Sequence, residues 1–219
     1  EIALNFGWFG SKLCVRFPSH AQMSKISSLF KRKKELQEPE LHIVGQIVGA
    51  SNINVGNAFS TIRVVRGKDN WSCVEGTEKG QTQIDYPLEG GMIVWNHPID
   101  LHYYAKSIQG WPKIVFEVYS MDFYGGHQIC GYSCCSVPTS PGVHELDCPI
   151  WRPCGTHKDE VYDFYVGCTP RLMSHAKALI HDPVVAKEER CRLFTKTVGT
   201  IHLQLSIVLR NMKSHKVQS

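Results

Sequence analysis

Cysteine and histidine are the side chains of this sequence that could take part in the widest range of chemistry. The chain of 219 residues contains nine cysteines and eleven histidines. A catalytic thiol needs a neighbouring base and a lowered pKa. In ICGYSCCSV, strand-like alternation would place Cys130 and Cys134 on one side and Cys135 on the other. Because small thiols fill core space well, this pattern favours packing over catalysis, and we predict no catalytic residue.

A structural zinc site usually has two pairs of ligands at short spacing. The sequence has no C-x-x-C motif, so core or loop roles are favoured over zinc binding for the one conceivable set, Cys148, Cys154, His157 and Cys168. The odd number and scattered positions of the cysteines also favour reduced thiols over a disulfide framework. No P-loop is present, and no G-x-G-x-x-G motif opens a helix, so nucleotide binding has no support. We therefore predict no cofactor, no metal ion and no small-molecule substrate.

The segment WPKIVFEVYSMDFYGGHQICGY (residues 111–132) predicts a strand, a turn and a returning strand, with Asp122 near the tip. It resembles the calcium loop of C2 domains, in which Ser120 and Asp122 would occupy two aspartate positions. A second loop, GASNINVGNAFSTIRV (residues 49–64), has asparagines and no carboxylate. Calcium requires six to eight oxygen ligands with sufficient negative charge. We therefore expect Asp122 to form a turn rather than to bind calcium.

A basic run, KRKK, lies in the N-terminal part of the chain. Its residues could contact anionic lipid or nucleic acid, act as a nuclear address, or cover a solvated helix end. The following ELQEPE offsets the charge, which favours the solvated interpretation. Lipid contact is retained as the alternative for Lys31, Arg32, Lys33 and Lys34.

Aromatic and histidine side chains are concentrated in VWNHPIDLHYYAKSIQGWPK (residues 94–113). One alternating strand cannot bury all of them, and aromatic side chains are enriched at the centres of protein interfaces. This pattern predicts a partner-binding surface, with the alternative that Trp95 and Trp111 fill the ends of the core. The candidate surface residues are Trp95, His97, His102, Tyr104 and Trp111.

The elements that must position these residues are mainly β-strands. In HLQLSIVLR, Leu203, Leu205, Ile207 and Leu209 alternate with polar residues, apart from Val208. In KIVFEVY, Ile114, Phe116 and Val118 alternate with Val115, Glu117 and Tyr119. Further short segments rich in β-branched and aromatic residues, separated by turn signals, predict an antiparallel β-sandwich. One short helix is predicted at THKDEVYDFYVG, with Thr156 as its cap and Asp159 three residues later.

Charge and residue composition divide the chain into three parts. Residues 1–40 have seven basic and four acidic side chains and predict an arm or linker, whereas the rest is nearly neutral within a total of +4. Residues 41–213 predict the folded domain, and residues 214–219 a tail. The sequence lacks an apolar run long enough to span a membrane and a signal-peptide pattern, so we expect a soluble, intracellular chain. The small net charge gives no indication of nucleic-acid binding.

Five segments resemble the B9 domain family in the same order, between His42 and Met212: HIVGQIVGAS, EGTEKGQTQIDYP, WNHPIDLHYYAKSIQGWPKIVFEVYSMDFYG, GYSCCSVPTSPGVHELDCPIWRPCG and GTIHLQLSIVLRN. The combination of GQTQ, HPIDLH, QGWP, PTSPG and WRP is specific to that resemblance. Residues 1–40 have no counterpart in the family pattern.

The resemblance implies a C2-like β-sandwich without enzyme activity. It further implies a subunit of the tectonic-like (Meckel syndrome) complex at the ciliary transition zone, with other B9 domain proteins and complex subunits as partners. Such a subunit would support cilium assembly and the ciliary diffusion barrier. The expected locations are the cytoplasm, the cytoskeleton, the basal body and the transition zone. Calcium-independent binding to ciliary membrane phospholipid is the alternative function.

Overall fold

The computed structural model describes residues 38–88, 91–166, 170–172 and 193–212. The basic run Lys31–Lys34, the predicted tail 214–219 and the predicted arm as far as residue 37 lie outside these ranges. Cys168, one member of the conceivable zinc set, also lies outside them.

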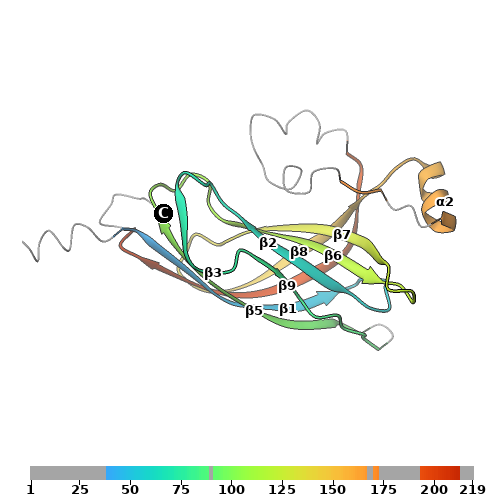
Figure 1. Cartoon of the computed structure of the whole chain (residues 1–219), viewed down its shortest axis with the longest axis horizontal. Coiled ribbons are helices and arrows are strands. Elements are labelled where there is room, and N and C mark those ends of the chain that lie inside the picture. The colour runs from blue at the N-terminus through green and yellow to red at the C-terminus, as the bar shows by residue number, and fades with distance from the viewer. Residues whose placement is uncertain (1–37, 89–90, 167–169, 173–192, 213–219) are drawn as a thin grey trace, which may run out of the picture. The chain divides into compact units, whose positions relative to one another are not determined.

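Within the described residues, nine antiparallel strands and one helix form the fold (Figure 1). The order across the sheet is β3-β5-β1-β9-β8-β7-β6-β2-β4. The strands are β1 (Glu40–Ser51), β2 (Phe59–Val65), β3 (Trp71–Gly76), β4 (Lys79–Gln81), β5 (Ile93–Ala105), β6 (Lys113–Met121), β7 (His127–Ser136), β8 (Gly142–Pro153) and β9 (Thr195–Arg210).

The sheet divides into two facing layers at the junction of β7 and β8. These two strands pair at Tyr132 with Trp151, whereas β8 pairs with β9 along its whole length. One layer is therefore β3-β5-β1-β9-β8 and the other is β7-β6-β2-β4 (Figure 1). The predicted all-β, antiparallel sandwich is confirmed, with the addition that one continuous sheet supplies both layers.

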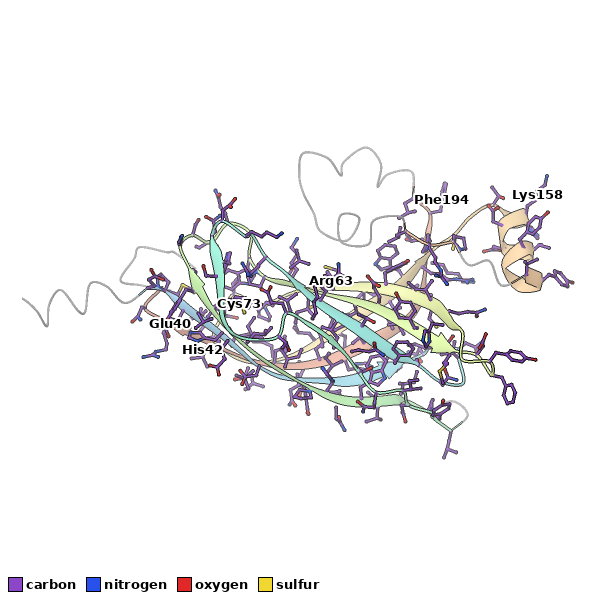
Figure 2. All side chains as sticks on the ribbon, viewed as in Figure 1. Glu40, His42, Arg63, Cys73, Lys158 and Phe194 are labelled. Carbon is purple, nitrogen blue, oxygen red and sulfur yellow. The ribbon has the colours of Figure 1, made fainter. Side chains whose placement is uncertain are left out.

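Alternating side chains fill the space between the layers (Figure 2). On β9, Ile201, Leu203, Leu205 and Ile207 are buried, and the intervening residues face outward. On β6, Ile114, Phe116 and Val118 are buried in the same core. The strands predicted from HLQLSIVLR and KIVFEVY are confirmed, because period-two patterns place every second side chain on the core face.

A second, smaller apolar cluster lies on the outer side of β6 and β7. Val115, Ile129 and Tyr132 are buried there, with Trp151 and Leu172 packed against them. The Leu172 backbone N–H donates a hydrogen bond to the Tyr132 hydroxyl over 3.2 Å. Both faces of this layer are therefore partly covered, which explains why Val115, on the predicted outer side, is apolar.

The helix α2 (His157–Val166) confirms the short helix predicted from the sequence. The Asp159 carboxylate accepts hydrogen bonds from the Thr156 N–H at 2.7 Å and the Thr156 hydroxyl at 2.9 Å. These bonds hold the pKa of Asp159 below its usual value and satisfy a free N–H at the helix start. Among the described residues, no helix has the length and apolarity needed to span a membrane.

Candidate interaction surface

Trp95 is a core residue, which corrects its assignment to a contact surface. Its side chain is 1% exposed, and its indole N–H donates to the Ala58 carbonyl over 3.1 Å. Ala58 precedes β2 in the opposite layer, so the indole joins the two layers. The structure therefore agrees with the alternative interpretation, in which Trp95 fills the core.

Trp111 and His97 also make contacts within the fold. The half-buried Trp111 donates its indole N–H to the Val137 carbonyl over 2.8 Å and packs edge-on against Trp71. His97 lies against β4, where a Cβ built on Gly80 would be 3.3 Å from the His97 Nε2. These contacts place both side chains at boundaries of the core rather than on one common surface.

His102 and Tyr104 do share a surface, the outward face of β5. Their rings are 5.3 Å apart and meet edge to face. In the β1–β5 register, His42 lies opposite His102 and Glu40 lies opposite Tyr104. The structure therefore brings together two of the five predicted residues, and it adds neighbours from β1.

The same outward face continues across β1, β9 and β8 as a group of uncharged residues, which we call the valine patch and which Asp100 on β5 and Glu145 on β8 flank. It comprises Val44, Gln46, Val143, Gln204, Ser206 and Val208. The three valines are 46%, 69% and 47% exposed, respectively. Ser206 on β9 lies between Val44 on β1 and Val143 on β8 in the strand registers. With Gly45, five of these residues line a shallow depression of about 350 Å³ that is widely open to solvent.

Charged and histidine side chains border the valine patch at both ends. At one end, Arg210 and Glu40 form an ion pair of 3.3 Å. At the other end, His202 and Asp147 are 2.6 Å apart, and His202 also contacts the Ser51 hydroxyl. Uncharged, partly apolar residues with charged side chains at their rim resemble a protein interface, in which the charged residues lie mainly at the edge.

Asp122 has the structural role predicted for it. Its Oδ1 accepts hydrogen bonds from the N–H groups of Tyr124 at 2.9 Å and Gly126 at 2.6 Å. In the neighbouring loop, the Asn57 side-chain amide exchanges two hydrogen bonds with the Met121 backbone, at 2.9 and 2.8 Å. These two polar side chains hold the loops in place through bonds to the backbone.

The described cysteines show packing rather than activation. Cys135 and Cys148 are buried in the core, where a hydrogen bond between the two thiols and their burial raise the pKa of Cys148. Desolvation by burial raises the pKa of the Cys130 thiol. Because Cys148 is directed into the core, it is poorly placed to join Cys154 and His157 in a zinc site.

Comparison with known proteins identifies the class to which this sandwich belongs. The family model described as "Ciliary basal body-associated, B9 protein" (B9-C2) matches residues 41–208. The chain belongs to this family, and the matched residues extend from the start of β1 almost to the end of β9.

Within the family, the chain is similar to B9 domain-containing protein 2. It is 40% identical to the Homo sapiens protein over 179 residues, which cover 82% of this chain and 98% of that protein. The Danio rerio protein is 41% identical over 180 residues, with coverage of 82% and 99%. B9 domain-containing protein 1 of Mus musculus is 29% identical over 178 residues, covering 79% of this chain and 83% of that protein.

Among solved structures, a C2 domain of plant extended synaptotagmin 1 matches with a TM-score of 0.38 and 13% identity. That match covers 78% of this chain and 95% of that domain.

The sequence interpretation missed Glu40 and His42, the residues that complete the end of the outward face. Glu40 was assigned to the N-terminal arm, and His42 was placed in the segment HIVGQIVGAS without being named as a site residue. Alternation in ELHIVG places Glu40 and His42 on one face, which is the available signal. Their proximity to His102 depends on the pairing of β1 with β5, which local sequence does not reveal.

Proposed function

We propose that this chain is a non-enzymatic scaffold subunit of the tectonic-like complex at the ciliary transition zone. In that role it binds other B9 domain proteins and supports cilium assembly and the ciliary diffusion barrier. Membership of the ciliary basal body-associated B9 family supports the location. The observation that favours scaffolding is the exposed valine patch, shallowly depressed and bordered by charged side chains.

The valine patch suits a partner with a nearly flat, partly apolar surface. Burying the exposed valines of three adjacent strands favours association, because apolar surface removed from water contributes a favourable free energy. The side chains project from paired strands, so little conformational entropy is lost on binding. The edge strand β3 offers a second contact, since free backbone groups of an edge can pair with a partner strand.

Val143→Glu is expected to weaken partner binding by at least about tenfold, because Val143 is the most exposed of the three valines and a carboxylate in its place would have to be desolvated on binding. The experiment captures the tagged full chain from ciliated cells and measures the co-purified B9 domain proteins. Val161→Glu, at an exposed valine on α2, is the matched control and should bind normally. Thermal unfolding verifies that both variants fold. Normal capture by folded Val143→Glu would remove the valine patch from the proposal.

A specific feature of the β6–β7 hairpin favours a second function, calcium-independent contact with phospholipid. At its tip, Phe123 and Tyr124 are 98% and 93% exposed and meet edge to face. Aromatic side chains of this kind favour the boundary between lipid headgroups and acyl chains. Calcium is not required, since the Asp122 Oδ1 that would bind it already accepts two backbone hydrogen bonds.

Replacing Phe123 and Tyr124 together by alanine is expected to abolish flotation of the chain with anionic phospholipid vesicles. Wild-type flotation should be the same with calcium and with a chelator. Tyr165→Ala, at an exposed tyrosine on α2, is the control and should float as the wild type does. Flotation that increases with calcium would contradict the structural role of Asp122. Flotation that survives the double substitution would exclude the hairpin tip.

A further inference from the structure

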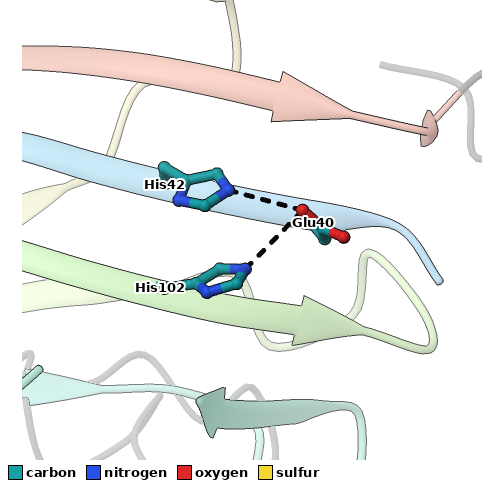
Figure 3. Close-up of side chains that lie close together, drawn as sticks. All are labelled: Glu40, His42 and His102. Carbon is teal, nitrogen blue, oxygen red and sulfur yellow. Dashed lines mark hydrogen bonds and ion pairs between the residues drawn. The ribbon is translucent and has the colours of Figure 1, made fainter. Parts of the chain in front are cut away.

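Three side chains that can bind a metal ion converge at the start of β1. Glu40 and His42 are two residues apart on one strand and therefore project from the same face. His102 lies opposite His42 on β5. Figure 3 shows that both imidazole rings direct a nitrogen toward the Glu40 carboxylate, and Figure 2 places Glu40 and His42 near the end of the sheet.

The distances agree with ligands of a single ion. The Glu40 Oε2 is 3.4 Å from the His42 Nε2 and 3.7 Å from the His102 Nε2. All three ligand atoms lie within 4.8 Å of one another. In a tetrahedral zinc site with bonds of about 2.0–2.1 Å, ligand atoms are separated by about 3.3–3.4 Å. Both distances from the carboxylate to the imidazoles are therefore close to those of a tetrahedral zinc site.

The two imidazoles are stacked rather than opposed, with centroids 4.0 Å apart and planes inclined by 14°. Stacking orients both Nε2 atoms to the same side, where the carboxylate lies. The nitrogen lone pairs are almost parallel, so a tilt of one ring would be needed for both to point at a common ion. His42 has room for this tilt, because its side chain is 30% exposed.

The His102 Nε2 is the atom of this cluster whose hydrogen-bonding capacity is least satisfied. This atom is buried and has no hydrogen-bond partner among the described residues, since the Glu40 Oε2 is too distant at 3.7 Å. A buried polar atom without a partner is costly. Coordination of an ion would satisfy the nitrogen without introducing another side chain.

We propose that Glu40, His42 and His102 form a binding site for a divalent transition metal ion, with Zn²⁺ the best match. Two imidazoles and one carboxylate are characteristic ligands of such ions, whereas Mg²⁺ and Ca²⁺ prefer an all-oxygen set. Water on the exposed side would supply the fourth ligand. The ion would connect the first residue of β1 to β5 and thereby stabilise the end of the sheet. This proposal departs from the sequence-based expectation of no metal.

Arg210 is the natural competitor of the ion. Its Nη1 is 3.3 Å from the Glu40 Oε2, the same oxygen that would bind the metal. The Arg210 side chain is 58% exposed, so it can move into solvent when the ion binds. Removing this arginine should therefore tighten metal binding, because the ion would no longer have to displace it from the Glu40 carboxylate.

The test titrates Zn²⁺ into the full chain, kept reduced by a non-chelating reductant, and follows binding by calorimetry. Cobalt(II) then reports the ligands through its visible spectrum. We expect one ion per chain, bound without the charge-transfer absorption of a cobalt–thiolate bond. His102→Gln and His42→Gln should each weaken binding by more than about 100-fold, the upper end of the effect of outer-shell changes. Arg210→Gln should tighten it several-fold.

His202→Gln is the matched control, because His202 lies on the same outward face beside the carboxylate of Asp147. It should leave Zn²⁺ affinity unchanged. Thermal unfolding with a chelator verifies folding of each variant, and the more exposed His42 provides a test if His102→Gln does not fold. Absence of Zn²⁺ binding by the wild type, a cobalt–thiolate spectrum, or unchanged affinity in folded His42→Gln would each overturn the proposal.

Discussion

Trp95→Ala is expected to lower the free energy of unfolding by about 3–5 kcal/mol, which is the usual cost of removing a buried tryptophan. The indole is 1% exposed, and its N–H is bonded to the Ala58 carbonyl over 3.1 Å. The substitution would therefore leave a cavity between the layers and a buried carbonyl without its partner. Urea unfolding followed by far-ultraviolet circular dichroism measures the change.

Trp95→Phe separates the two contributions to this effect. It retains an aromatic ring in the core but removes the hydrogen bond to Ala58, so it should cost less than Trp95→Ala. Stability of Trp95→Ala within about 1 kcal/mol of the wild type would show that Trp95 is not a buried core residue. Any loss of partner binding by Trp95→Ala has to be attributed to unfolding before it is attributed to a contact.

Gly45→Ala is the second substitution with a large expected effect. A Cβ at this position would lie 2.1 Å from the Gln204 carbonyl oxygen and 2.9 Å from the Leu205 Cα, both backbone atoms of β9. Because backbone cannot rotate away as a side chain can, β1 and β9 would have to separate locally. We expect a loss of about 3 kcal/mol, the upper end for overpacking, measured by urea unfolding.

Gly56→Ala provides the control for Gly45→Ala. A Cβ on Gly56 would have no atom within 4 Å, so the substitution should be neutral or slightly stabilising. If Gly45→Ala were as stable as Gly56→Ala, the close pairing of β1 with β9 would be contradicted.

Local patterns in the sequence were sufficient to predict most of the strands and the short helix. Alternation in HLQLSIVLR and KIVFEVY identified which side chains face the core, since a strand has a fixed period of two. The Thr156–Asp159 spacing identified the helix start. The scarcity of carboxylates near Asp122 correctly indicated a turn, because the hydrogen-bonding needs of the loop are local.

Features that depend on strand pairing could not be predicted in the same way. The burial of Trp95 is set by its bond to Ala58 in the opposite layer. The convergence of His42 and His102 is set by the β1–β5 register, which a bulge between Ile47 and Gly49 shifts by one residue. Neither contact produces a pattern within a single strand, because its two members lie far apart in the sequence.

The valine patch shows the same limitation. Val44, Val143 and Val208 each appear as an isolated exposed valine in the sequence, and single exposed apolar residues are common. Only the order β1-β9-β8 places them on one continuous face. The sequence therefore predicted the class of protein and its fold, whereas the candidate contact face required the three-dimensional arrangement.

Equilibrium binding between this chain and a purified B9 domain-containing protein 1, measured by calorimetry, tests the scaffold function most directly. We predict a stoichiometric complex with the wild-type chain and at least about tenfold weaker binding with folded Val143→Glu, while Val161→Glu binds as the wild type does. Equal affinity of all three chains, or no complex with the wild-type chain, would contradict assembly with this B9 partner through the valine patch.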